Sequence, residues 1–194
     1  MTRGKTVIIT APSGAGKTTI VKNLLNIEDL ELEFSISACT RPRREGEVNG
    51  RDYYFMSADT FKDKIEEDEF IEWEEVYKNS YYGTLKSEIN RIWRKKHNIL
   101  FDVDVMGGIT LKQIFGKDAF SLFIMPPSLD VLKQRLEARG KDSLQSLENR
   151  INKASLEIKY APRFDKVIIN DDLQETLKEA ELTVREFLGK PLEK

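Results

Sequence analysis

The stretch of sequence that decides the fold is Ala11-Pro12-Ser13-Gly14-Ala15-Gly16-Lys17-Thr18. A compact β-branched run, Val7 to Thr10, precedes it, and a segment with apolar residues at helical spacing, Ile20 to Leu25, follows it. Glycines allow successive backbone N–H groups in such a turn to point inward, and the N-terminus of the following helix adds a partial positive charge. A strand, a glycine-rich turn and a helix in this order therefore predict an anion-binding loop.

This loop resembles the phosphate-binding P-loop, or Walker A motif, with Ala11 at the position of the first glycine. Position 11 begins the loop, where alanine costs little if φ is negative. In such a loop Lys17 reaches the β- and γ-phosphates of a nucleoside triphosphate, and the Thr18 hydroxyl is a ligand of Mg²⁺. A chance glycine-rich turn is the alternative, but the strand before it and the helix after it favour the motif. The residues expected to bind the triphosphate are Ala11, Pro12, Ser13, Gly14, Ala15, Gly16, Lys17, Thr18 and Thr19.

The chain has 194 residues, with 31 Lys and Arg against 33 Asp and Glu, which gives a net charge of −2. Because there is no overall basic field, the composition argues against nucleic acid as a main partner. A chain of this length buries about 70% of its unfolded surface on folding, which is enough for one sizeable core. We therefore expect a single domain with lobes.

Cys39 is the only cysteine, so neither an intrachain disulfide nor a cysteine zinc site is possible. The apolar run near the N-terminus is far too short for the core of a signal peptide. No stretch approaches the ~20 apolar residues that a membrane helix needs. These features predict a protein of the reducing cytoplasm without a membrane partner.

Short β-rich runs alternate with longer helical periods along the chain, which predicts a parallel sheet covered by helices on both faces. Residues 34–84 break this rhythm with short, one-sided strands and predict an inserted antiparallel lobe, and the charged stretch 129–160 predicts a mobile helical flap. The expected strands are Val7–Thr10, Phe34–Ala38, Tyr53–Met56, Phe70–Tyr77, Ile99–Val103, Phe120–Met125 and Val167–Ile169. Helices are expected after an N-cap at Ser57, from Thr84 through Trp93, over 111–115, from Ser128 to Gly140, from Leu144 to Tyr160 and from Leu173 to Leu188.

Two further features carry groups suited to chemistry. Arg41, Arg43 and Arg44 crowd one loop and form a rigid fork suited to a phosphate, although a solvated basic loop would look the same. Beside a P-loop, they suggest a second phosphate-bearing substrate. Glu72 and Glu74 share one side of the strand 70–77, where a solvent-facing glutamate is the ordinary interpretation and the one we adopt for Glu74.

The motifs taken together resemble those of the guanylate kinases. The segments that occur in the order and spacing typical of that family are Ser37 to Tyr53, Glu69-Phe70-Ile71-Glu72-Trp73, Tyr81-Tyr82-Gly83-Thr84 (placed at a turn), Asp102-Val103-Asp104 and Ile169-Asn170-Asp171-Asp172. The resemblance covers about residues 5–188. It implies an α/β, P-loop NTPase-type parallel sheet flanked by helices, with a core of residues 1–35, 89–126 and 164–194, an inserted mixed β GMP-binding lobe over 36–88 and a helical lid over 127–163.

The resemblance also implies the substrates ATP and GMP, the products ADP and GDP, Mg²⁺ as the cofactor and dGMP as a further acceptor. The residues that match those holding the guanine base are Ser37, Glu72, Thr84 and Asp102, and those that match the GMP-phosphate positions are Arg41, Arg44, Tyr53 and Tyr82. The Glu72 carboxylate can accept from guanine N1–H and the 2-amino group together. Adenine offers neither donor there, so such a site rejects it.

The remaining matches concern the triphosphate side. Arg135, Arg139 and Arg150 match lid arginines that close over the ATP phosphates and, with Lys17 and Arg41, complete the catalytic set that the resemblance implies; without it, arginines on charged helices would indicate a solvated face. Asn170 matches a position that contacts the ATP adenine. Asp104 is the candidate for holding Mg²⁺ through water. Met106 stands where the family usually carries Gln, and it cannot donate that hydrogen bond.

Three other interpretations fit the sequence less well. Another nucleoside monophosphate kinase would share the P-loop but has no reason for Glu72 with Thr84. A catalytically dead module that binds a phosphorylated peptide typically loses the P-loop lysine or the lid arginines, which are all present here. A GTPase is disfavoured because the chain has no Asn-Lys-x-Asp motif. The sequence does not indicate an oligomeric state.

Overall fold

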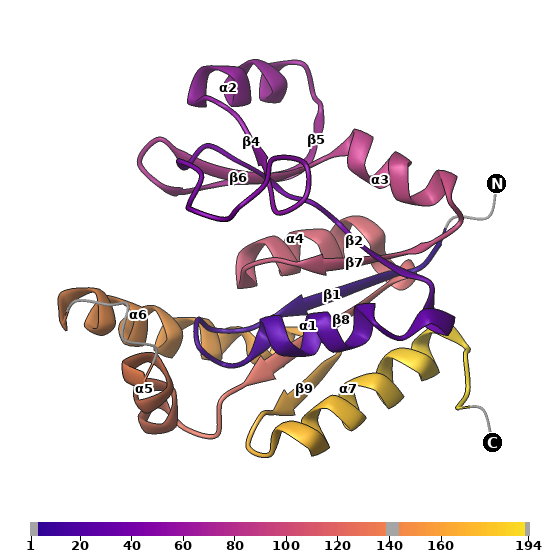
Figure 1. Cartoon of the computed structure of the whole chain (residues 1–194), viewed down its shortest axis with the longest axis vertical. Coiled ribbons are helices and arrows are strands. Elements are labelled where there is room, and N and C mark those ends of the chain that lie inside the picture. The colour runs from indigo at the N-terminus through magenta and orange to yellow at the C-terminus, as the bar shows by residue number, and fades with distance from the viewer. Residues whose placement is uncertain (1–3, 139–143, 193–194) are drawn as a thin grey trace.

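A five-stranded parallel sheet forms the centre of the protein in the computed structural model, which describes residues 4–138 and 144–192 (Figure 1). The strand order is β2-β7-β1-β8-β9, and every neighbouring pair is parallel. The bounds are β1 (Thr6–Thr10), β2 (Leu32–Phe34), β7 (Asn98–Asp102), β8 (Ala119–Met125) and β9 (Lys166–Ile169). The predicted parallel sheet is therefore confirmed.

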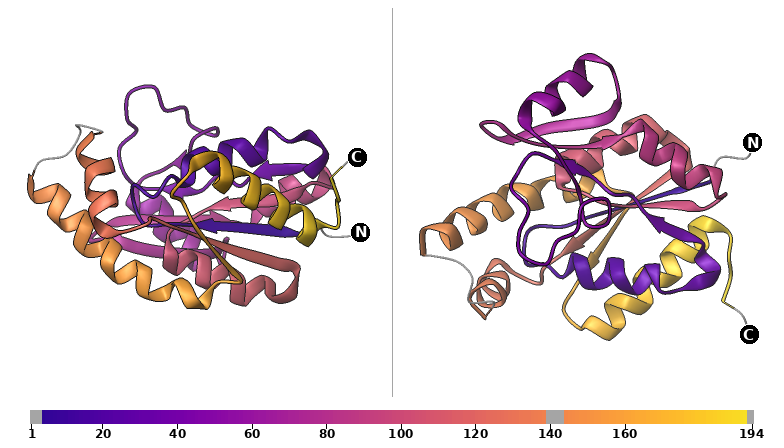
Figure 2. Two further views of the ribbon diagram at one scale, coloured as in Figure 1. Left: turned by 90° about the horizontal axis from the view of Figure 1, so that it is seen from below. Right: turned by 45° about the horizontal axis from the view of Figure 1, so that its top comes forward.

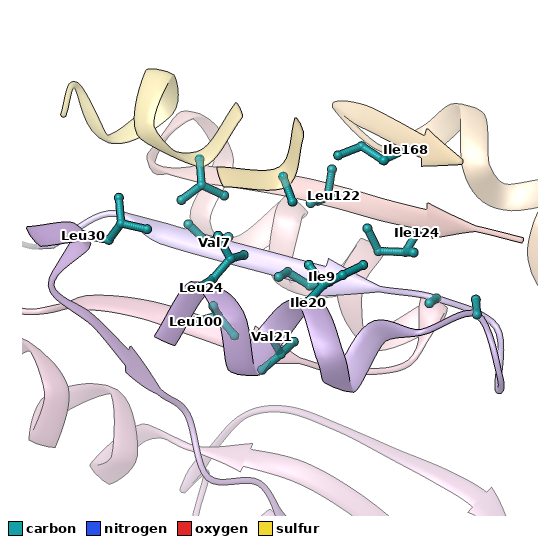
Figure 3. Close-up of a cluster of buried hydrophobic side chains, with 14 residues drawn as sticks. Val7, Ile9, Ile20, Val21, Leu24, Leu30, Leu100, Leu122, Ile124 and Ile168 are labelled. Carbon is teal, nitrogen blue, oxygen red and sulfur yellow. The ribbon is translucent and has the colours of Figure 1, made fainter. Parts of the chain in front are cut away.

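Helices cover both faces of this sheet, as predicted (Figures 1 and 2). On one face, α1 (Lys17–Leu25) and α7 (Leu173–Leu188) pack on Val7 and Ile9 of β1, in the buried cluster drawn in Figure 3. On the other face, α3 (Lys86–Arg94) and α4 (Val105–Phe115) pack around Ile8. The alternation of side chains along β1 thus supplies two separate cores from one strand.

A second, smaller sheet lies between β2 and α3 in the chain. Its order is β4-β3-β6-β5, with β4 (Tyr54–Phe55), β3 (Ala38–Cys39), β6 (Ser80–Leu85) and β5 (Phe70–Tyr77). The β3–β4 pair is parallel and the other pairs are antiparallel, so the sheet is mixed, as the resemblance implies, and the wholly antiparallel lobe expected from the strand pattern is wrong. The helix α2 (Ala58–Glu66) covers it, and Phe61 stacks on Phe70 and Tyr81 with ring centroids 4.2 and 5.5 Å apart. Ser57 is the N-cap of α2, as predicted, because its side chain accepts from the Thr60 N–H at 3.1 Å.

Two further helices extend from the core on the side away from α3 (Figure 1). α5 (Leu129–Ala138) and α6 (Leu144–Glu157) pack on each other through Leu132, Leu136, Leu147 and Ala154. Ser128 caps α5 as predicted, since its hydroxyl accepts from the Val131 N–H at 3.1 Å. The expected end of this helix at Gly140 lies outside the described residues. The short helices are η1 (Glu28–Leu30), η2 (Gly116–Asp118) and η3 (Ile158–Arg163), and η3 takes up the last turn of the helix expected to reach Tyr160.

The structure corrects four local expectations. The single strand expected over 34–38 is divided between β2 in the core sheet and β3 in the small sheet, because the Ser35 N–H still bonds to the Leu100 carbonyl whereas Ala38 pairs with Tyr54. The expected turn at Tyr81-Tyr82-Gly83-Thr84 is the strand β6. Thr84 is not a helix cap: Leu85 holds that position at α3. The helix expected over 111–115 also begins earlier, at Val105.

The described part of the chain contains no helix that is both long and apolar enough to span a membrane.

A buried carboxylate joins the two sheets. Glu88 of α3 accepts from the backbone N–H of Ile36, which lies between the sheets, and from the hydroxyl of Tyr54 in β4, each at 2.9 Å. Arg91, one turn along α3, adds two bonds of 2.8 Å. Burial alone would raise the pKa of Glu88, but these hydrogen bonds hold it below its usual value. Glu88 therefore helps to fix the position of the small sheet relative to the core.

Glu88→Gln should destabilise the fold, because it puts an amide donor among groups that all donate and removes the charge that Arg91 pairs with. Breaking a buried ion pair costs about 3–5 kcal/mol, and we expect a loss of that order in urea unfolding at pH 7. Glu66→Gln in α2 is the matched control: Glu66 is exposed, and its change should stay within about 0.5 kcal/mol. Equal unfolding free energies for the two variants would show that Glu88 does not join the sheets.

Candidate active site

The carboxyl ends of the core strands meet at one edge of the sheet, where open α/β sheets place their ligands. The P-loop follows β1, Asp102 ends β7, and Asn170 follows β9. A cavity of about 570 Å³ lies at this edge, between the P-loop, the small sheet and α6. The predicted site residues that line it are Ala11, Pro12, Ser13, Gly14, Gly16, Lys17, Thr18, Ser37, Arg44, Tyr53, Glu72, Tyr82, Asp102, Asp104 and Arg150.

The P-loop has the backbone shape that its glycines allow. Gly14 and Gly16 have φ values of +97° and +100°, in the left-handed region that other residues rarely adopt. The turn closes with a 3.1 Å bond from the Ala15 N–H to the Pro12 carbonyl. Gly16 is the N-cap of α1 and has no side chain, so the first N–H groups of the helix receive no side-chain acceptor from that residue. This arrangement suits an anion.

Lys17 reaches across from the P-loop to the end of β7. Its ammonium group donates to the Val103 carbonyl at 3.0 Å and forms an ion pair with Asp102. Both side chains of the ion pair are about one-fifth exposed. The P-loop lysine is therefore held at the cavity by contacts with the end of β7 and the residue after it.

Glu72 points from β5 into the cavity, opposite the P-loop in the lining. The Thr84 hydroxyl on the neighbouring strand β6 donates to one of its oxygens at 2.7 Å, and the two residues are partners in the strand register. Burial, with the nearby negative charge of Asp104, raises the pKa of Glu72 to about 6, although the bond from Thr84 acts in the opposite direction. Glu72 is thus a partly desolvated carboxyl group that titrates close to neutral pH.

Glu74 also lines the cavity, so its expected place on a solvent face is wrong. Burial and the proximity of Asp104 raise the pKa of Glu74 to about 7, against the opposite effect of Lys153. Asp104 itself is the N-cap of α4 and accepts from the Gly107 N–H at 2.8 Å. The face of β5 that carries Glu72 and Glu74 therefore forms an acidic wall of the cavity.

The basic loop is ordered by Glu47. Arg41 donates to both carboxylate oxygens of Glu47, at 2.7 and 2.6 Å, and the Arg44 N–H donates to the same carboxylate at 2.8 Å. The Arg41 guanidinium lies 4.8 Å from the ring centroid of Tyr53, whose phenol has its pKa raised by burial. Arg41 thus braces the loop, and Arg44 is the arginine of this loop that lines the cavity.

Helix α6 supplies a further wall of the cavity. Arg150 of α6 donates to the Ser13 hydroxyl at 3.2 Å, and Lys153 and Glu157 line the cavity beside it. These last two residues were missed in the sequence, although positions 150, 153 and 157 lie on one helix face, a spacing that could have indicated them. Arg135 donates to the Asn170 carbonyl at 2.9 Å. Arg139 lies outside the described residues.

The structure keeps some predicted site residues out of the cavity lining. They are Ala15, Thr19, Arg41, Thr84, Arg135 and Asn170. Ala15 and Asn170 are buried against each other, since the Asn170 amide donates to the Ala15 carbonyl at 2.7 Å. Thr84 contacts the cavity through Glu72. Asn170 thus supports the P-loop, and Thr84 supports Glu72.

The oxygen groups near the P-loop fit a magnesium ion held mainly by phosphates and water. Oxygen donors among the lining residues include the Thr18 hydroxyl and the carboxylates of Asp102 and Asp104. Within residues 4–138 and 144–192, no cluster of three or more His, Cys, Asp or Glu side chains forms a metal cage. Mg²⁺ in phosphoryl-transfer sites uses one or two protein oxygens together with substrate phosphates, so this donor set is compatible with it.

Comparison with known proteins agrees with this arrangement. The family model for guanylate kinase matches residues 3–187. The guanylate kinase of Porphyromonas gingivalis is 46% identical over 186 residues, which cover 96% of this chain and 99% of that protein. The guanylate kinase of Bacteroides fragilis is 48% identical over 185 residues, covering 95% of this chain and 90% of that protein.

The fold agrees as well. The crystal structure of guanylate kinase from Anaplasma phagocytophilum superposes with a TM-score of 0.75 at 27% sequence identity, covering 94% of this chain and 85% of that one. The predicted α/β P-loop NTPase-type fold is confirmed by this match and by the two sheets. The chain belongs to the guanylate kinase family.

Proposed function

We propose that this protein transfers the γ-phosphoryl group of ATP to GMP, giving ADP and GDP. The observation that carries the proposal is a single cavity with the P-loop on one side and, on the other, the half-buried Glu72 bonded to the buried Thr84. One side suits a triphosphate, and the other presents acceptors to a guanine edge. Family membership supports the same ATP-dependent phosphorylation of GMP.

On the acceptor side, the carboxylate of Glu72 receives guanine N1–H and the 2-amino group, with Ser37 and Asp102 at the remaining polar edge. Arg44 and Arg41 bind the GMP phosphate, with the phenols of Tyr53 and Tyr82 beside them. These contacts involve the base and the phosphate and leave the 2′-hydroxyl unread, so we include dGMP as an acceptor.

On the donor side, the inward N–H groups of the P-loop and the ammonium of Lys17 bind the ATP phosphates. Lys17 exchanges its contacts with Asp102 and Val103 for phosphate oxygens. Thr18 and the Asp104 oxygen not bonded to Gly107 would hold Mg²⁺, Asp104 through water. When bound, Mg²⁺ neutralises charge on the phosphate oxygens.

Transfer then depends on position and charge rather than on a general base. The GMP phosphate has a second pKa near ~6 and is largely dianionic at pH 7, so its oxygen attacks without losing a proton. We assign residues 127–163 to a lid that brings Arg135, Arg139 and Arg150 over the transferred group and excludes water that would hydrolyse ATP. The small sheet and its helix, within 36–88, form the GMP-binding lobe.

The proposal is tested by measuring ADP release from ATP with GMP, dGMP, AMP, UMP and TMP in turn. GMP should give rapid turnover, dGMP should be accepted, and the other three should stay near the rate without acceptor. ADP release with GMP no faster than with buffer would overturn the proposal and leave the peptide-binding module as the better interpretation.

Lys17→Ala should lower kcat by about 100-fold or more, the loss typical when one preorganised charge is removed from the reacting phosphates. GMP affinity measured by calorimetry should change little, because Lys17 serves the donor side. Lys22→Ala, an exposed lysine on the same helix, is the matched control and should retain wild-type turnover. A loss of GMP affinity as large as the loss of turnover would contradict this division of labour.

Arg41→Ala and Arg44→Ala should each raise the GMP KM more than about ten-fold, since a charge-assisted hydrogen bond contributes about 1.5–3 kcal/mol. The larger effect is expected for Arg41→Ala, because it also leaves Glu47 unpaired beside the phosphate. The ATP KM should stay constant in both. Arg43→Ala, exposed on the same loop and outside the cavity lining, is the control. If the three variants behaved alike, the loop would be a solvated surface.

The pH dependence of GMP use should report Glu72. Its raised pKa of about 6 means that the free enzyme takes up a proton as the pH falls through 6, and the protonated group loses an acceptor that guanine needs. Wild-type kcat/KM for GMP should therefore fall toward acid pH. The GMP phosphate titrates in the same range, so the informative quantity is the ratio of wild type to Glu72→Gln, which shares that titration. This ratio should shrink as the pH falls from 7.5 to 5. A constant ratio would show that the Glu72 carboxylate does not bind the base.

A further inference from the structure

Asn170 occupies a buried position between the P-loop and α5. It follows β9, is 4% exposed, and its backbone N–H donates to the Met125 carbonyl at 2.8 Å. Its side-chain amide donates to the carbonyl of Ala15 at 2.7 Å, so the amide is committed to the P-loop backbone. A residue whose only role was to read an exposed base would not need this burial.

The bond to Ala15 fixes the direction of one N–H group in the loop. The peptide between Ala15 and Gly16 is planar and trans, so its carbonyl and its N–H point in opposite directions. Because the carbonyl is turned toward Asn170, the Gly16 N–H is turned away from it, toward the concave side of the loop, and Gly16 lines the cavity. Holding the carbonyl therefore aims a donor at the place where phosphate oxygens bind.

Close packing makes this contact specific. A Cβ atom on Gly16 would lie 2.2 Å from the Asn170 amide nitrogen, so Gly16 is required both for its positive φ and for the approach of Asn170. The backbone carbonyl of Asn170 accepts from the Arg135 guanidinium of α5 at 2.9 Å. Leu132 and Leu136 of the same helix lie within 3.0 Å of where a Cβ of Gly14 would stand. The P-loop, Asn170 and α5 thus form one packed unit.

We infer that Asn170 is a positioning residue for the P-loop: its amide sets the Ala15–Gly16 peptide and so the affinity for a triphosphate, whatever base that triphosphate carries. The inference rests on the proposed function, because it takes the P-loop as the triphosphate site. It differs from a contact with adenine, which would affect ATP and leave base-free phosphates alone.

The test compares ATP with inorganic tripolyphosphate, each with Mg²⁺, by calorimetry. Asn170→Ser removes the donor without adding charge, and Asn170→Asp sets an acceptor against the Ala15 carbonyl. Losing a hydrogen bond of about 1 kcal/mol weakens binding about five-fold, and we expect a loss of at least that size, equal for ATP and tripolyphosphate, in both variants. GMP affinity should be unchanged, which also shows that each variant is folded. Asn26→Asp, the same change at the exposed end of α1, is the matched control and should bind both ligands as the wild type does.

Two results would overturn the inference. Weaker ATP binding with unchanged tripolyphosphate binding would show that Asn170 contacts the base. Unchanged binding of both ligands would show that Asn170 has no role in triphosphate binding. If Asn170→Asp did not fold, as judged by loss of GMP binding, Asn170→Ser would decide between these results. A wild-type protein that binds no tripolyphosphate would instead contradict the P-loop assignment in the proposed function, which is a distinct failure.

Discussion

The left-handed turn at Gly14 and Gly16 is the constraint on which the arrangement of the site depends. Two residues at φ near +100° let the chain leave the end of β1, turn its N–H groups inward and enter α1 within a few residues. The turn works only where β1 is central and its carboxyl end is flanked by β7 and β8, because the neighbouring strands then deliver Asp102 and the segment after Met125 to the same edge. The position of the cavity thus follows from this connection together with the parallel order of the sheet.

The small sheet contributes a carboxyl group that is costly to bury. A rise in the pKa of Glu72 from 4.5 to about 6 corresponds to at most about 2 kcal/mol of unfavourable free energy while it is charged, less to the extent that water still reaches it. As the pH falls, Glu72 takes up a proton in the folded state before it does in the unfolded state, because its pKa is higher in the folded state. The destabilisation is therefore present above pH 6 and disappears as the pH falls toward 4.5. A ligand that donates two hydrogen bonds to Glu72 would offset the cost, which favours guanine over bases without those donors.

The elements that depend on local pattern could be predicted from the sequence, and those that depend on distant partners could not. β1, β5 and α7 agree with their predictions because periodicity and caps determine them. The division of 34–38 between two sheets depends on Leu100 and Tyr54, far along the chain. The segment 81–84 is expected at a turn, whereas the structure pairs Gly83 with Trp73 and Ala38 in the middle of the small sheet.

In the candidate site, too, contacts between residues distant in the sequence could not be predicted. Residues carried by a continuous motif, such as Lys17 and Glu72, line the cavity. Strand alternation predicts that Glu74 shares a face with Glu72, but it does not predict which elements lie against that face. The solvent-facing position expected for Glu74 is wrong for this reason. Here that face meets Asp104 at the start of α4 and Lys153 on α6, both distant in the sequence. The connection of Asn170 to Ala15 spans 155 positions and leaves no local signal.

The central claim is that Glu72 reads the guanine base, and the most direct measurement is kcat/KM for GMP, IMP and AMP with the wild type and with Glu72→Gln. IMP keeps N1–H but lacks the 2-amino group, so the wild type should use GMP best and IMP far less. In the variant, one acceptor becomes a donor that faces a guanine donor, which costs about 1–3 kcal/mol, so GMP use should fall and the GMP-to-IMP ratio should shrink. The same order and the same ratios in both proteins would contradict the claim and make Glu72 a carboxylate of the cavity wall with no part in base selection.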